Sequence, residues 1–201
     1  MADDLPQLQQ QIKACQRCAL AGYPVQGPPI FSGNIHARLM LIGQAPGKME
    51  ANQTHKPFSG SAGKRLFHWL AQAGWQETDF RQRCYMTSVT KCFPGPNKSG
   101  RGDRAPTRTE QRLCAEWLEA ELVLVDPEVV VPVGKMAIER FFGRDRKLVD
   151  LIGGRYQIDG RIIVPLPHPS GASSWIQKRE HQALIVRALQ HLSILKKQLV
   201  L

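Results

Sequence analysis

A short apolar run, Arg38-Leu39-Met40-Leu41-Ile42-Gly43, leads directly into the turn Gln44-Ala45-Pro46-Gly47. An apolar run of this length that ends in glycine is typical of a strand buried on both faces. Runs rich in strand-forming or apolar residues follow at 84–90, 128–133 and 161–166. The sequence therefore predicts a sheet of four strands, of which residues 38–43 form the first.

Helical patterns separate these strands along the whole chain. Helices are expected at 5–15, 61–73, 107–125 and 135–142, and a last one runs from Ser173 or Ser174 to about Gln198. Thr107 and Glu110 have the spacing of a capping box at the start of the third helix. Alternating strands and helices predict an α/β fold, a three-layer α/β/α arrangement with a central, mostly parallel four-stranded sheet, forming a single domain over residues 1–201.

The segments with unusual composition fall where the predicted strands end. Gly43–Gly47 follows the first strand, Ser88–Cys92 ends the second, and His168 follows the fourth. Ligands of parallel sheets bind at the carboxyl ends of the strands, near a topological switch point. We therefore expect these segments to share one ligand site.

Four cysteines form a second group with a recognisable pattern. Cys15 and Cys18 form a C-x-x-C, and Cys92 and Cys114 flank a basic loop, whereas Cys84 stands apart and is expected to be a small buried residue. Four thiolates are the ligand set of either an iron–sulfur cluster or a zinc site. The sequence alone leaves both metals open.

The charge of the chain points to a polyanionic partner. The 201 residues carry a formal net charge of +10, with a pI of about 9.7, and small basic domains usually bind nucleic acid. The loop cations Lys98, Arg101, Arg104 and Arg108 are expected to neutralise phosphates, with a solvated charge run as the alternative. No signal sequence or membrane-spanning run is evident, so we expect a cytoplasmic protein without membrane contact. We also expect it to be a monomer.

Three motifs together resemble the uracil-DNA glycosylase superfamily. Gly43–Gly47 resembles its water-activating G-x-x-P-G loop, residues 57–60 resemble its P-F-x-G base-stacking segment, and residues 168–170 resemble its H-P-S uracil-binding loop. The set of Cys15, Cys18, Cys92 and Cys114 is similar to the cysteines of the iron–sulfur branches, families four and five. The order of the motifs and the cysteine set carry the resemblance, which extends from Cys15 to the last helix.

The resemblance implies that uracil is flipped out of DNA and cut from its sugar in base excision repair. Glu50 would orient the attacking water and stabilise the sugar cation, and His168 would bind the carbonyl oxygen that gains negative charge. The backbone amides of Gln44 and Ala45 would add donors, and Phe58 would stack on the base, with core packing as the alternative for Phe58. The four cysteines would hold a 4Fe–4S cluster.

Two further residues are candidates for contact with DNA. The backbone around Ser170 could bind a phosphate at the start of the last helix. Trp175 could fill the gap left by the flipped base, or it could pack against the first turn of that helix. The sequence does not separate these two interpretations of Trp175.

One departure from the family widens the range of functions. Ser88 stands where family-four enzymes carry an asparagine that reads the uracil edge, and a serine cannot replace an amide at both positions. Family five also lacks that asparagine and accepts other deaminated bases. The alternatives to a uracil-DNA glycosylase are therefore an enzyme that also removes hypoxanthine or xanthine, a non-catalytic iron–sulfur protein that binds nucleic acid, and a zinc-containing nucleoside hydrolase.

Overall fold

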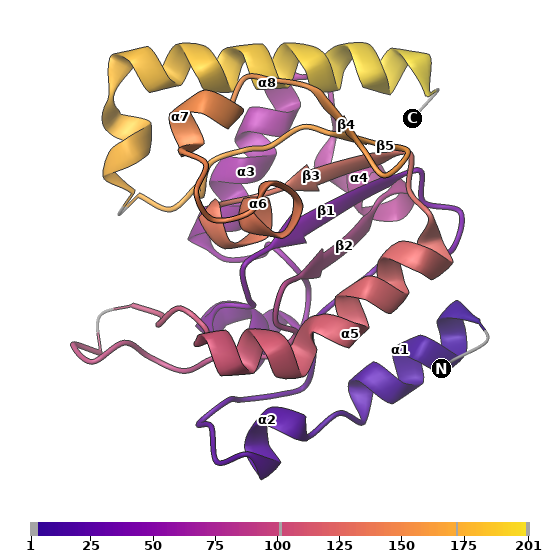
Figure 1. Ribbon diagram of the computed structural model, residues 1–201, viewed down its shortest axis with the longest axis vertical. Helices are drawn as coiled ribbons and strands as arrows, with labels where there is room; N and C mark the ends of the chain where they lie inside the picture. Colours follow the sequence, from indigo (N-terminus) through magenta and orange to yellow (C-terminus); the bar gives the residue numbers. More distant parts are fainter. Residues whose placement is uncertain (1–3, 101, 172, 200–201) are drawn as a thin grey trace.

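The computed structural model describes residues 4–100, 102–171 and 173–199. Its centre is a five-stranded sheet in the order β2-β1-β3-β5-β4 (Figure 1). The strands are β1 (Leu39–Gly43), β2 (Tyr85–Ser88), β3 (Val129–Pro132), β4 (Tyr156–Ile158) and β5 (Arg161–Ile163). All neighbouring pairs are parallel except β4 with β5. The predicted α/β class with a mostly parallel sheet is confirmed.

The prediction of four strands was one short. The additional strand, β4, forms an antiparallel hairpin with β5 at the edge of the sheet. Asp159 and Gly160 connect the two strands, and both have positive φ angles, 48° and 77°. An Asp-Gly pair between short strands is a strong hairpin signal, because a tight hairpin turn needs this backbone conformation. Only the length of β4, three residues, hides it from the periodicity of the sequence.

Helices cover both faces of the sheet, as the three-layer prediction requires. Leu39 and Leu41 of β1 pack on one side, in a cluster with residues of α3 (Ser61–Gln72), α4 (Glu77–Arg83) and α8 (Arg179–Gln198). Met40 and Ile42 pack on the other side with residues of α1 (Leu5–Lys13), α5 (Arg108–Val125) and α6 (Lys135–Phe142). The alternation along β1 supplies both cores because successive strand side chains point to opposite faces.

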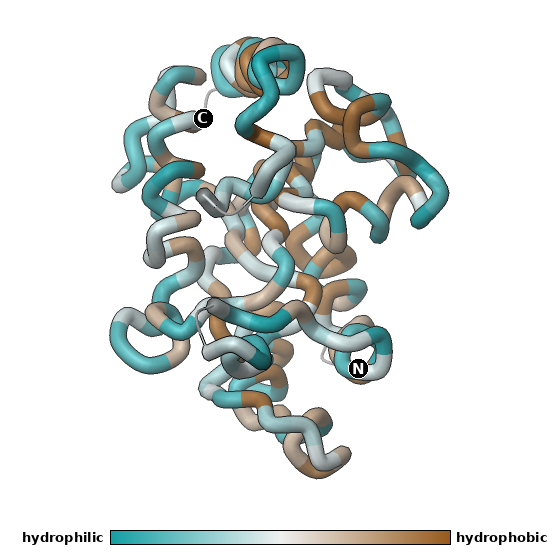
Figure 2. The backbone as a smooth tube through the Cα atoms, turned by 90° about the vertical axis from the view of Figure 1, so that its left-hand side faces the viewer, coloured by the Kyte–Doolittle hydropathy of each residue, from teal (hydrophilic) through white to brown (hydrophobic). Residues whose placement is uncertain are grey.

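The helix starts show where local signals succeed and where they fail. Thr107 and Glu110 form the expected capping box at the start of α5. The start of the last helix was predicted too early: Ser174–Gln177 is a separate 3-10 turn, Ser173 makes no side-chain cap bond, and α8 begins at Arg179. In Figure 2, α8 is seen end-on at the top, with hydrophilic and hydrophobic residues along it. Four short elements were not predicted: α2 (Arg17–Leu20), η1 (Glu50–Thr54, a π-helix), α4 and α7 (Leu148–Leu151).

The carboxyl ends of the strands meet at one edge of the sheet. Gly43 lies opposite Ser88, and Val133 forms a bridge with Leu166 just beyond β3 and β5. β1 lies between β2 and β3. After β1 the chain continues to β2 on one side, and after β3 it continues to the β4–β5 hairpin on the other side. This change of direction opens a crevice at the carboxyl ends of β1 and β3. Within the described residues, no helix has the length and apolar character that crossing a membrane requires.

Candidate functional site

A cavity of about 580 Å³ opens at this edge of the sheet. It is lined by the loop after β1, by η1, by the turn at 57–60, by the end of β2 and by the segment after β5. The catalytic and substrate-binding candidates taken from the sequence all lie in its wall: Gln44, Ala45, Glu50, Phe58, Ser88 and His168. The structure thus brings together side chains from four separate segments of the chain.

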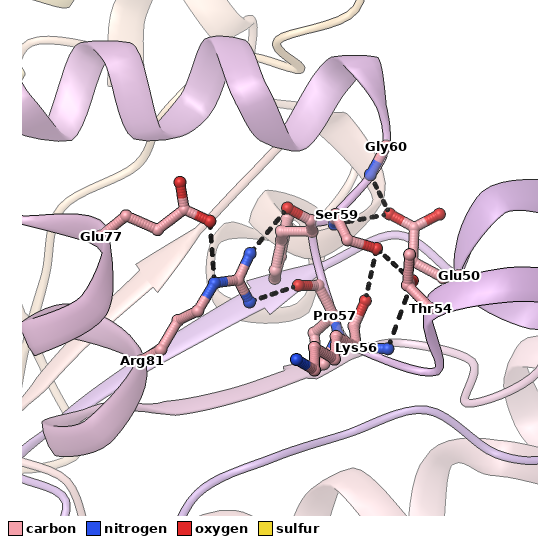
Figure 3. Close-up of polar contacts among 9 residues, drawn as sticks. Glu50, Thr54, Lys56, Pro57, Ser59, Gly60, Glu77 and Arg81 are labelled. Carbon is pink, nitrogen blue, oxygen red and sulfur yellow. Dashed lines mark hydrogen bonds and ion pairs between the residues drawn. The ribbon is translucent and has the colours of Figure 1, made fainter.

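Glu50 holds the walls of this cavity together. Its Oε1 accepts hydrogen bonds from the backbone N–H groups of Ser59 and Gly60, both at 2.9 Å, and its Oε2 accepts one from Gly47 at 3.1 Å. Figure 3 shows the two bonds from the turn converging on the carboxylate. The side chain is 8% exposed. A buried carboxylate with three N–H donors fixes the loop after β1 against the turn at 57–60.

Arg81 holds the same turn from the other side (Figure 3). Its guanidinium donates to the carbonyl oxygens of Pro57 at 2.8 Å and Phe58 at 3.1 Å, and it pairs with Glu77 at 2.9 Å. These bonds stabilise Phe58 in a left-handed conformation, with φ at 53°, which side chains rarely adopt. The result is an aromatic ring in a fixed place in the cavity wall.

Two glycines make room for Phe58. A Cβ at Gly43 would lie 2.9 Å from the end of the Phe58 ring, and a Cβ at Gly63 would lie 1.9 Å from the Phe58 carbonyl oxygen. The second distance is far below any van der Waals contact, so only glycine fits at the start of α3 beside this turn. The same ring also contacts the core on the α3 side of the sheet. Phe58 therefore packs against the core and forms part of the cavity wall.

His168 enters the cavity as a neutral hydrogen-bond donor. The Ser170 N–H donates to its Nδ1 at 3.2 Å, so the proton of the neutral ring is on Nε2. Burial lowers the pKa of His168 below its ordinary value of 6.5, because the charged ring loses hydration. Its ring packs against Gly134, where a Cβ would lie 3.1 Å from Cδ2.

We expect nitrogen NMR of the histidine rings to show this state directly. One ring, identified by its loss in His168→Ala, should remain neutral at pH 6.5 with its proton on Nε2. Because the pKa of His168 is lowered, the ring takes up a proton only below the pH at which an ordinary histidine is half charged. A ring that is half protonated at pH 6.5 or above, or that carries its proton on Nδ1, would contradict this assignment.

Ser88 lies at the back of the cavity and is 5% exposed. Its hydroxyl donates to the Thr90 carbonyl oxygen at 2.8 Å, so the hydroxyl proton is engaged within the protein. Toward the cavity, Ser88 can therefore offer only an acceptor.

A buried ion pair lies directly behind Ser88. Lys91 donates through Nζ to Glu121 at 2.6 Å, to the Thr87 hydroxyl at 2.8 Å and to the Ser88 carbonyl oxygen at 2.7 Å. Glu121 also accepts from Tyr85 at 3.1 Å. The sequence analysis missed this network, because nothing in the local pattern links a lysine after β2 to a glutamate in the middle of α5.

A second cavity, of about 280 Å³, is lined by all four predicted metal ligands, Cys15, Cys18, Cys92 and Cys114. The Trp117 indole N–H donates to Cys15 Sγ at 3.2 Å, and the Lys91 backbone N–H donates to Cys114 Sγ at 3.3 Å. Burial, and then the neighbouring thiol of Cys114, raise the pKa of Cys18 to about 11 and that of Cys92 to about 12. Such thiols become thiolates only beside a cation, which suits a metal-bound group. As expected, Cys84 lies apart and buried.

The DNA-contact candidates have different surroundings. Lys98 and Arg108 are exposed, Arg101 lies outside the described residues, and Arg104 forms a two-bond ion pair with Glu110 at 2.6 and 2.7 Å. Arg104 therefore also fixes its loop to α5. Ser170 is partly exposed. The Trp175 ring stacks on His181, with ring centres 4.1 Å apart, and contacts the core, which agrees with the packing interpretation of this residue.

Comparison with known proteins gives matches over most of the chain. A sequence model of the uracil DNA glycosylase superfamily matches residues 30–193. The type-4 uracil-DNA glycosylase of Thermotoga maritima is 30% identical over 164 residues, 80% of this chain and 79% of that protein. The type-4 enzyme of Pyrobaculum aerophilum is 32% identical over 79% of this chain and 76% of that protein. The type-5 enzyme of Thermus thermophilus is 36% identical over 60% of this chain and 57% of that protein.

Proposed function

This chain belongs to the uracil-DNA glycosylase superfamily, and we propose that it removes uracil from DNA by hydrolysing the bond between the base and its deoxyribose. The main support is that one cavity contains the carboxylate of Glu50, the neutral imidazole donor of His168 and the aromatic ring of Phe58. The product would be an abasic site in an otherwise intact strand, the starting point of base excision repair.

The chemistry of the reaction assigns a role to each of these groups. The flipped uracil would stack on Phe58. As the bond from C1′ to the base breaks, its electron pair leaves with the uracil, and His168 donates from Nε2 to the carbonyl oxygen that becomes negative. The amides of Gln44 and Ala45 would add further donors there. The Glu50 carboxylate would stabilise the positive sugar and orient the water that bonds to C1′.

The exposed cations of the loop support DNA as the partner. Lys98, Arg108 and the residues around Ser170 would contact phosphates. Arg104 would act mainly by holding the loop, because its guanidinium is already paired with Glu110.

We further propose that Cys15, Cys18, Cys92 and Cys114 hold a 4Fe–4S cluster. Their shared cavity supports this, and so do the two N–H groups directed at the sulfurs of Cys15 and Cys114. When bound, the cluster would act as a structural link between the N-terminal segment, the basic loop and α5.

Ser88 supports a broader choice of base. Because its hydroxyl proton is engaged by Thr90, it can accept from an N–H at the base edge but cannot donate to a second position. Uracil, hypoxanthine and xanthine all present such an N–H. Release of the two purines alongside uracil is therefore the second candidate activity.

Single-lesion oligonucleotides test both activities. We expect the wild-type protein to release uracil, and His168→Ala to lower the single-turnover rate by at least about tenfold, because a donor to the leaving base is lost. Binding of the same DNA should persist. His36→Ala removes an exposed imidazole elsewhere and should change neither quantity. A wild-type protein that binds DNA but releases none of the three bases would instead be a non-catalytic binder.

Three expectations from the sequence stay predictions. They are a single domain over residues 1–201, a cytoplasmic location and a monomeric state. The last can be checked by light scattering with and without DNA.

A further inference from the structure

A second carboxylate reaches the cavity from the loop between Cys92 and Cys114. Asp103 lies in the cavity wall with Glu50 and His168. Backbone bonds fix its place: Asn97 N–H donates to Gly102 at 2.7 Å, and Arg104 N–H donates to Gly95 at 3.0 Å. Asp103 itself forms an antiparallel bridge with Pro96. The carboxylate is thus presented by an ordered part of the loop.

Gly47 shows how close the two carboxylates are. A Cβ at this position would lie 2.8 Å from Asp103 Oδ2 and 2.9 Å from Glu50 Oε2. Gly47 is not among the residues with positive φ, so its backbone does not require glycine, but a side chain there would displace the two carboxylates. Both oxygens face that space, and a single water molecule could contact both of them.

The two carboxylates differ in how much of their bonding capacity is already used. Glu50 accepts three backbone N–H groups, which leaves about one of the four acceptor positions of a carboxylate for a water molecule. Asp103 is an exposed residue, but partial burial of its carboxylate and then the charge of Glu50 raise its pKa above the ordinary value, against the effect of a backbone hydrogen bond from Lys48. Asp103 therefore has free acceptor positions and a greater tendency to take up a proton than an ordinary aspartate has.

We propose that Asp103 is a catalytic residue that binds the attacking water and accepts its proton, an inference that rests on the proposed function. The water oxygen forms a bond to C1′, and the bond from C1′ to the base breaks with its electron pair on the base. One proton of the water passes to the Asp103 carboxylate and then to solvent, and the released base takes up a proton from solvent. Glu50 also contacts the water and stabilises the sugar cation.

Asp103→Asn tests this role, because it keeps the size of the side chain but removes its ability to take up a proton. The single-turnover rate of uracil release should fall about 100-fold, the scale of a lost general base. Affinity for DNA that contains a non-cleavable 2′-fluoro-uridine, measured by fluorescence anisotropy, should stay within about threefold of wild type. Asp103→Glu, which keeps the carboxylate, should recover part of the rate.

The matched control is Asp159→Asn, at the exposed turn between β4 and β5, where asparagine also tolerates the positive φ. It should leave rate and affinity unchanged. The proposal is wrong if wild type cleaves and Asp103→Asn cleaves within about threefold of it, or if affinity for the non-cleavable DNA falls as much as the rate. In either case the proposed function stands. A wild-type protein that releases no base overturns both.

Discussion

Glu50→Ala should slow single-turnover release of uracil by about 1,000-fold, the largest effect on activity that we expect from one substitution. The change removes the negative charge beside the sugar cation and the acceptor of three backbone N–H groups. The turn that carries Phe58 then loses its connection to the loop after β1, so electrostatic and positional effects add. Glu50→Gln should be milder, about 100-fold, because an amide oxygen can still accept from Ser59 and Gly60.

The control for this prediction lies on the other side of the same turn (Figure 3). Glu77 pairs with Arg81 at the surface, with its side chain 50% exposed, and exposed pairs contribute little. Glu77→Gln makes the same chemical change and should reduce the rate less than threefold. If Glu50→Gln were as active as Glu77→Gln, the carboxylate at position 50 would have no part in the reaction.

Lys91→Met should produce the largest loss of stability. Lys91 and Glu121 are 1% and 0% exposed, and removal of one partner from a buried pair costs about 3–5 kcal/mol, because the other charge stays buried without compensation. In protein that holds the proposed cluster, the urea midpoint should fall by more than about 1 M. Circular dichroism measures it, and iron content shows whether the cluster is retained.

A double substitution separates the loss of pairing from the loss of packing. Lys91→Met combined with Glu121→Leu replaces the pair by apolar side chains and should recover much of the lost midpoint. Thr87 and Tyr85, whose hydroxyls face Glu121, would lose a partner, so recovery should be incomplete. A wild-type midpoint for Lys91→Met alone would show that the ion pair contributes nothing to stability.

The parts of the fold that follow from short-range pattern could be predicted from the sequence. The four apolar strands lie in the predicted segments, α6 has the predicted bounds, and α5 begins at the predicted capping box. These features depend on neighbouring residues alone. β4 escaped because three residues show no usable period, although the Asp-Gly turn was a visible signal.

The candidate site likewise has residues that could be predicted from the sequence and residues that could not. Gln44, Glu50, Phe58 and His168 could be selected because each lies in a motif at a strand end, and parallel strands bring their carboxyl ends together. The position of Asp103 in the cavity and the Lys91–Glu121 pair could not be predicted, because both depend on how a long loop and a distant helix pack. The three N–H bonds to Glu50 were also unforeseen, since their donors come from the loop after β1 and from the turn at 57–60, which only the folded chain brings together.

The four cysteines around one cavity also constrain the order in which the protein can mature. Cys15 and Cys18 leave the ribosome early, whereas Cys114 follows only after more than half of the 201 residues have been made. A cluster held by all four cannot be completed before that point. A nascent chain would display two of these thiols until Cys92 is made and three until Cys114 is made, so the proposed cluster could be completed only afterwards.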